Sequence, residues 1–128
     1  MKIEVSTGEV VDKITILQIK KEKISDNLKL AHIGKELSVL EDTLKDSKIK
    51  VPQELIDQLR DVNLKLWDAE DIIRDRENQN LFDDEFIKCA RLDAKLNDER
   101  FLVKNKINNV CESNIKEQKS YEGLYSAN

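Results

Sequence analysis

Apolar residues recur at intervals of three and four along most of the chain, which is the spacing of an amphipathic helix. The first such stretch predicts a helix over residues 7–25, after an extended arm at 1–6, and Ser6 and Glu9 match a capping box at its start. A second predicted helix covers 26–46 and begins at the Ser25-Asp26-Asn27 break. Its apolar face is a heptad seam formed by Leu30, Ile33, Leu37, Leu40 and Leu44. Gly34 lies within this helix, so either a neighbouring backbone comes close there or the helix is locally weak.

Two longer helices are predicted in the second half of the chain. Residues 46–52 read as a loop, and Pro52 suits the first turn of a helix over 52–78. Phe82 and Asp83 resemble a hydrophobic staple and cap, which begins a helix over 83–111. The apolar faces of these two helices consist of Leu55, Leu59, Val62, Leu66, Ala69 and Ile73, and of Phe86, Cys89, Leu92, Leu96, Val103, Ile107 and Val110. We therefore expect an all-α fold, a single domain over 1–128 that forms an antiparallel bundle of about four long helices with coiled-coil-like packing.

The last residues, 112–128, lose this periodicity and are predicted to form a tail. Tyr121, Leu124 and Tyr125 are the residues that could dock it onto the bundle. The chain contains no internal repeat and no low-complexity segment. The heptad spacing is divided among separate predicted helices and does not follow one continuous helix. This favours a bundle over one uninterrupted fibrous coiled coil.

Polar side chains also recur at helical spacing within the two longer helices. The candidate binding residues on the third and fourth helices are Asn63, Trp67, Glu70 and Arg74, and Asn97, Arg100 and Lys104, with Asp93 on the same side of the fourth. Asp12 and Lys13 flank the apolar face of the first helix and are candidates for the same polar layer, although surface exposure fits them equally well. Polar groups near a bundle interior must be paired, so these stripes form either a buried network or the lining of a site.

An anion-binding site is one interpretation of these stripes. Trp67 would supply an apolar wall, while arginine and lysine side chains would hold a carboxylate or phosphate. The alternative is a set of ordinary salt bridges, such as Glu70 with Arg74, or Asp93 or Glu99 with Arg100. Asn97 discriminates best between the two, because a neutral amide on a half-apolar face usually has a specific partner.

Composition narrows the functional classes. Charged residues make up 38% of the chain and aromatic residues 5%, as in long solvated helices, and the net charge of −4 argues against nucleic-acid binding. Residues 51–83 carry nine acidic and four basic side chains, which is either a site for a basic partner or, more simply, a solvated helix face. No apolar run is long enough to span a membrane, and the N-terminus lacks the apolar core of a secretory signal.

The cysteines and the histidine predict neither a disulfide nor a metal site. Cys89 and Cys111 fall in one predicted helix, roughly 33 Å apart, so we expect free thiols and a cytoplasmic location. His32 is the only histidine and lacks the Glu-x-x-His pattern of a di-iron bundle, and no nucleophile with an activating base is evident. We expect no catalytic residue, no metal and no cofactor.

Four sequence segments resemble a family of short bacterial and phage proteins of unknown function. They are MKIEVSTGEVVDKITIL, LWDAEDIIRDRE, NDERFLVKNKIN and EQKSY, in this order. The resemblance implies a soluble, all-helical single domain and implies no activity. It directs attention to the residues within those motifs: Glu9, Asp12, Lys13, Trp67, Asp68, Glu70, Asp71, Arg74, Asn97, Asp98, Arg100 and Tyr121.

Three functional hypotheses follow. The leading one is a non-enzymatic helical binding or protein-interaction module, forming a homo-oligomer or binding a protein partner through an exposed apolar seam. The second is a small all-helical enzyme or anion-binding protein with an Arg/Lys/Trp site between the third and fourth helices, by analogy with chorismate mutases. The last is a helical nucleotide pyrophosphatase, which would need Glu-x-x-Glu pairs on two helices, whereas the fourth predicted helix lacks a convincing acidic set.

Overall fold

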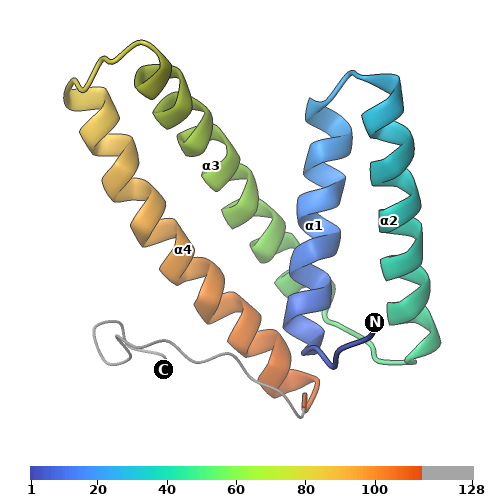
Figure 1. Cartoon of the computed structure of the whole chain (residues 1–128). Coiled ribbons are helices and arrows are strands. Elements are labelled where there is room, and N and C mark those ends of the chain that lie inside the picture. Colours follow the sequence, from blue (N-terminus) through green and yellow to red (C-terminus); the bar gives the residue numbers. More distant parts are fainter. Residues whose placement is uncertain (114–128) are drawn as a thin grey trace.

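The computed structural model describes residues 1–113, and these contain four helices joined by short connections (Figure 1). The helices are α1 (Thr7–Lys23), α2 (Asn27–Asp46), α3 (Gln53–Asn78) and α4 (Asp84–Val110). Successive helices run in opposite directions, so α1 and α2 form one hairpin and α3 and α4 form another. The predicted all-α bundle is thus confirmed. Residues 114–128, which include Tyr121, Leu124, Tyr125 and the EQKSY motif, lie outside the described residues.

Helix α1 is the central element of the described structure. It packs against α2 on one side and against both α3 and α4 on the other, whereas α2 packs against α1 alone among the helices. The two hairpins are inclined to each other and come together near the start of α1 and the end of α4 (Figure 1). A helix in this position has to bury more than one face, which explains why α1 has few fully exposed residues before Lys21.

Three groups of buried apolar side chains hold the helices together. One joins α1, α3 and α4 through Val11, Leu59, Val103 and Ile107. A second joins α1 to α2 through Ile14, Leu17, Ile33 and Leu37, and a third joins α3 to α4 through Val62, Leu66 and Leu96. Except for Val11, the residues of these groups lie on the apolar faces that the periodicity predicts, so burial of these stripes is the main source of stability.

The predicted apolar face of α4 is buried only in part. Leu92 and Val110 are 40% and 58% exposed, although the spacing places both on the apolar side. The straight helix explains this difference: 3.6 residues per turn do not match a repeat of 3.5, so a long apolar stripe drifts around the helix and leaves the interface.

The helix ends largely follow the predicted capping residues. Asp26 accepts hydrogen bonds from the backbone N–H groups of Leu28 and Lys29, and Asp83 accepts one from Phe86. Helix α1 ends at Lys23 rather than residue 25, because Ile24 turns into an extended conformation and packs against the α1–α2 apolar group. These bonds satisfy backbone donors that the first helical turn leaves without partners.

Only one of the two hydrogen bonds of the predicted capping box is present at the start of α1. Ser6 Oγ accepts a hydrogen bond from the Glu9 backbone N–H at 3.1 Å, as the sequence predicts. The Glu9 carboxylate does not complete the box in the expected way, because it binds the Lys104 ammonium of α4 at 2.8 Å instead. A charged partner on the neighbouring helix gives a stronger hydrogen bond than the helix's own backbone amide.

Glycine matters at Gly8 and not at Gly34. A Cβ atom at Gly8 would lie 2.6 Å from the Lys104 carbonyl oxygen, so only glycine lets α1 approach α4 this closely. A Cβ at Gly34 would meet no atom of residues 1–113 within 4 Å. Within that part of the chain no backbone comes close to Gly34, which leaves the other explanation, a helix that is locally weak. No helix among the described residues has the length and apolar character needed to cross a membrane.

Candidate functional site

A buried carboxylate, Asp12, lies where α1 meets α3 and α4. Its side chain is 1% exposed. Arg100 of α4 holds both carboxylate oxygens, with Nε donating to Oδ1 at 2.9 Å and the terminal nitrogen donating to Oδ2. Asn63 Nδ2 of α3 donates a further hydrogen bond to Oδ1 at 2.9 Å, and the Lys104 ammonium lies 3.9 Å from Oδ2. A buried charge surrounded in this way is compensated for its lost hydration.

The side chains around Asp12 also form hydrogen bonds with one another and with the Asp12 backbone. Asn63 Nδ2 also donates to Thr15 Oγ1 at 2.9 Å, and the Thr15 hydroxyl in turn donates to the Asp12 backbone carbonyl at 2.8 Å. Both N–H bonds of the Asn63 amide are therefore used, and the amide orientation is determined. Together these residues form a rigid polar layer across three helices, which we call the Asp12 network.

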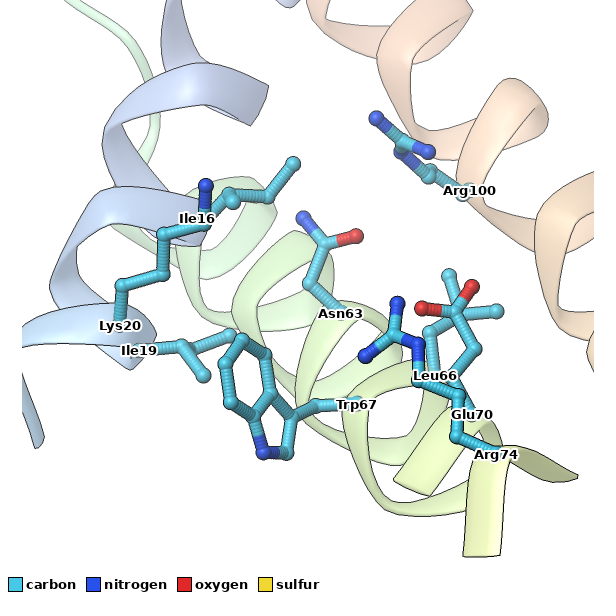
Figure 2. A pocket seen from close by; sticks show the side chains of 9 residues that line it. All are labelled: Ile16, Ile19, Lys20, Asn63, Leu66, Trp67, Glu70, Arg74 and Arg100. Carbon is cyan, nitrogen blue, oxygen red and sulfur yellow. The ribbon is translucent and has the colours of Figure 1, made fainter. Parts of the chain in front are cut away.

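A pocket lies beside the Asp12 network, between α1, α3 and α4 (Figure 2). Its volume is about 170 Å³. The lining residues come from α1 (Ile16, Ile19 and Lys20), from α3 (Asn63, Leu66, Trp67, Glu70 and Arg74) and from α4 (Arg100). In Figure 2 the Trp67 ring faces the α1 side chains, while Arg74 and Glu70 lie together on the other side of it. The pocket thus combines one aromatic wall with several charged groups.

The pocket lining carries more positive than negative side chains. Lys20, Arg74 and Arg100 are basic, and Glu70 is the one acidic residue among the nine that line the pocket. Arg100 is neutralised by Asp12, but within residues 1–113 neither Lys20 nor Arg74 forms an ion pair close enough to count as a salt bridge. With the Arg100–Asp12 pair set aside, Lys20 and Arg74 outnumber Glu70, so the lining carries an excess of one positive charge in a chain whose net charge is −4.

Glu70 faces a second carboxyl group, Asp93, across the α3–α4 interface. Burial raises the pKa of Glu70 above its ordinary value of 4.5, and the hydrogen bond with Asp93 and the Asp93 charge raise it further, while Arg74 and Arg100 act in the opposite direction. Asp93 Oδ1 is buried and finds no hydrogen-bond donor among the described residues in their fully ionised form. A proton on Glu70 would supply that donor, since two ionised carboxylates cannot hydrogen-bond to each other.

Asn97 connects this carboxyl pair with the Asp12 network. Its amide nitrogen donates to the Asp93 backbone carbonyl at 3.1 Å and lies 3.4 Å from Asp93 Oδ2, and its amide oxygen accepts from Arg100 at 3.5 Å. Polar groups thus run without interruption from Asp12 through Arg100 and Asn97 to Asp93 and Glu70. Asn97 has specific partners, but it lies behind the pocket wall and not in its lining.

The predicted candidate residues separate into three groups. Asn63, Trp67, Glu70, Arg74 and Arg100 come together in the pocket lining. Asp12, Asn97 and Lys104 lie outside that lining and are held by other side chains; Lys104 is buried and pairs with Glu9. Lys13 is exposed and lies 3.8 Å from Glu9, so it does not belong to the polar layer. Arg100 pairs with Asp12 of α1, a partner on another helix that the sequence interpretation does not name.

The α1 contribution to the pocket is the part that the sequence interpretation missed. Ile16, Ile19 and Lys20 are not among the candidate residues predicted from the sequence. A signal for them exists: Val11, Thr15, Ile19 and the neighbouring Ile16 form one helical stripe, beside a second stripe formed by Val10, Ile14 and Leu17. Two apolar stripes on one helix indicate contact with neighbours on two sides.

Neither cysteine has the features of a catalytic nucleophile. Both are free thiols, and burial raises the pKa of Cys89 and of Cys111, with the nearby Glu85 raising that of Cys89 further. A raised pKa leaves little of the reactive thiolate at neutral pH. Within residues 1–113 no three side chains are grouped as a metal site would require.

Comparison with known proteins places the chain in a family without assigning it an activity. No curated protein matches it, and no solved structure matches it. A family model covers residues 1–128, the whole of the sequence. The chain therefore belongs to a family of unknown function, DUF6165.

Proposed function

We propose that this protein binds a small anionic ligand in the pocket between α1, α3 and α4. The observation that carries the proposal is the juxtaposition of the Trp67 ring with Lys20 and Arg74 around one concavity. Binding pockets are typically apolar concavities with a few converging polar groups, and this one has that composition. Lys20 and Arg74 would bind the charged group, since neither is engaged in a salt bridge within residues 1–113.

The size of the pocket limits the ligand. A cavity of about 150 Å³ is known to hold benzene, and this pocket measures about 170 Å³. It therefore suits one ring or a group of similar size, with the charged group directed to the mouth. Trp67 offers a flat apolar surface against which a ring can stack.

The residues around the pocket favour ligand binding over catalysis. Asn63 and Arg100 line the pocket and also bind Asp12, so the Asp12 network fixes their positions relative to α1. No activated nucleophile lines the pocket, so we propose a binding protein and not a covalent catalyst. A cytoplasmic location is part of the proposal, because a reducing compartment keeps Cys89 and Cys111 as free thiols.

Fluorescence of Trp67 tests the proposal directly, because it is the single tryptophan of the chain. The protein is titrated with benzoate, phenyl phosphate and inorganic phosphate while its emission is recorded, and the Trp67 indole N–H signal is followed by NMR. Saturable changes are expected with the ring-bearing anions. Arg74→Gln should weaken their binding, whereas Lys35→Gln, which removes a positive charge from an exposed position on α2, should not. Equal effects of the two variants would contradict a role for Arg74 in the site.

A second candidate function, assembly of identical subunits, is favoured by one surface of α4. Ile87 and Leu92 are 52% and 40% exposed there and flank a shallow hollow that includes the bases Lys88, Arg91 and Lys95. We propose that this face packs in a coiled-coil-like manner against the acidic 51–83 segment of a second copy, whose charge is complementary. Light scattering of the purified protein tests it: Leu92→Glu should convert an oligomer to a monomer, and a wild-type protein that is monomeric at high concentration would refute it.

A further inference from the structure

Resting on the function proposed above, we propose that the pocket takes up a proton on the Glu70–Asp93 pair when it binds a carboxylate, so that the protein binds the anion and a proton together. The ligand class is then a weak acid with one ring. No covalent bond forms or breaks, and the only transfer is of one proton from solvent to the carboxyl pair.

The geometry of the pair supplies the proton site. Glu70 lines the pocket, and the carboxyl group of Asp93 on α4 is close enough to raise the pKa of Glu70, after burial, by its charge and by accepting a hydrogen bond from the protonated acid. One oxygen of Asp93 faces Asn97, and the other, Oδ1, is buried without a donor within residues 1–113 when both carboxyls are ionised. One proton on the pair satisfies that oxygen and removes one of two adjacent negative charges.

The surroundings of Glu70 explain why proton and anion should bind together. On its own helix Glu70 has Arg74, from α4 it meets Asp93 and Arg100, and from α1 Lys20 lines the same pocket. Arg100 is already bound to Asp12, so its charge is largely compensated. An ionised Glu70 would therefore repel a ligand carboxylate held by Lys20 and Arg74. Protonation removes that repulsion and leaves the two basic groups free to hold the anion.

The dependence of affinity on pH follows from this coupling. Burial, and then Asp93, raise the pKa of Glu70, and an anion bound beside it would act in the direction that its negative charge dictates, raising it further. If one proton is taken up with each ligand, the association constant falls by up to about tenfold for each pH unit above the Glu70 pKa. The number of protons taken up can be measured by calorimetry.

The experiment is a titration of the full chain with benzoate by isothermal calorimetry, in pairs of buffers that differ in ionisation enthalpy, from pH 5 to pH 8. The wild-type protein is expected to take up protons on binding. The number taken up per ligand should approach one at the higher pH values, where Glu70 is ionised before the ligand binds. Glu70→Gln, which mimics the protonated acid, should bind benzoate without proton uptake and lose most of the pH dependence. Asp93→Asn should shift the pH dependence to lower pH, because it removes two of the causes that raise the Glu70 pKa.

Glu77→Gln is the matched control, because it removes the same charge from an exposed position two turns further along α3. It should retain the wild-type proton uptake. Binding of benzoate without proton uptake, or a Glu70→Gln variant with unchanged pH dependence, would overturn this inference and leave the proposed binding function intact. Absence of any saturable Trp67 response, to benzoate or to phenyl phosphate, would overturn both. A circular-dichroism melt of each variant establishes that the fold is retained.

Discussion

At the scale of single residues, two carboxylates of similar chemistry have opposite roles because their neighbours differ. Asp12 is buried and receives hydrogen bonds from Arg100 and Asn63, so its negative charge is well compensated. Glu70 has a second carboxyl group as its neighbour, so its negative charge is disfavoured. Burial raises the cost of a charge in both places, and the partner decides whether the charge is kept.

Asp12→Asn should lower the free energy of unfolding by about 3 kcal/mol, because it leaves Arg100 with a neutral partner in a largely buried position. Urea denaturation monitored by circular dichroism measures this change. Asp61→Asn is the control, since Asp61 forms an exposed pair with Lys65 on α3 and should change stability by no more than about 0.5 kcal/mol. Similar losses for the two variants would show that burial of the Asp12 charge is not what matters.

Gly8, in the first turn of α1, and Gly34, in the middle of α2, should respond in opposite ways to alanine. Gly8→Ala forces a Cβ into the Lys104 carbonyl group, so α1 must move away from α4 and the protein should lose about 1–3 kcal/mol. Gly34→Ala meets open space and should gain up to about 1 kcal/mol through helix propensity alone. Thermal denaturation of the two variants side by side measures both. A stabilised Gly8→Ala protein would contradict the close approach of the helices.

At the scale of helices, the sequence predicts the elements well and their contacts poorly. Periodicity and capping residues locate all four helices to within two residues, because both signals act within one helix. Heptad spacing identifies an apolar face but does not name the helix that covers it. The partner of Arg100 lies 88 residues away on α1, and no local pattern indicates that pairing. The polar α3 and α4 residues of the pocket could thus be predicted, whereas the α1 wall is indicated only by a second apolar stripe, which does not name the helices that it contacts.

The cap of α2 allows a test of how local such signals are. Asp26 accepts hydrogen bonds from two backbone N–H groups, at 2.9 and 3.1 Å, and is exposed. Asp26→Ala should therefore cost about 1 kcal/mol and increase amide hydrogen exchange in the first turn of α2. Asp42→Ala, a change of the same residue type at an exposed position later in α2, should leave exchange in that turn as it is. Equal exchange in the two variants would show that the cap contributes little.

At the scale of the whole molecule, α1 unites elements that are distant in sequence. The Thr7 and Gly8 backbone N–H groups donate to Ser113 and Asn108, 106 and 100 residues further along the chain. The contacts within the α3–α4 hairpin join segments that follow each other in the chain, whereas α1 reaches its place only by closing this long loop. The Asp12 network, which joins α1 to both helices of that hairpin, stabilises this non-local arrangement.

The stability of the whole protein should depend on the Glu70 proton. Because the pKa of Glu70 is higher in the folded than in the unfolded protein, its contribution to stability is fully present below pH 4.5 and is lost as pH rises through the folded pKa. Glu70→Gln should not lose this contribution, so its stability relative to wild type should improve between pH 4 and pH 7. Urea denaturation across this range measures the difference. A constant difference between variant and wild type would mean that Glu70 titrates as it does in the unfolded chain.

The position of α2 at the edge of the fold determines which sequence changes and attachments this helix can tolerate. This helix packs against α1 alone among the helices and supplies no residue to the pocket lining, whereas the other three helices all contribute. Under the proposed binding function, the pocket constrains α2 only through the strip that covers α1, where Ile33 and Leu37 are buried. Its outer surface is free to diverge among relatives, and it is the natural place to attach a dye, an affinity tag or a second domain.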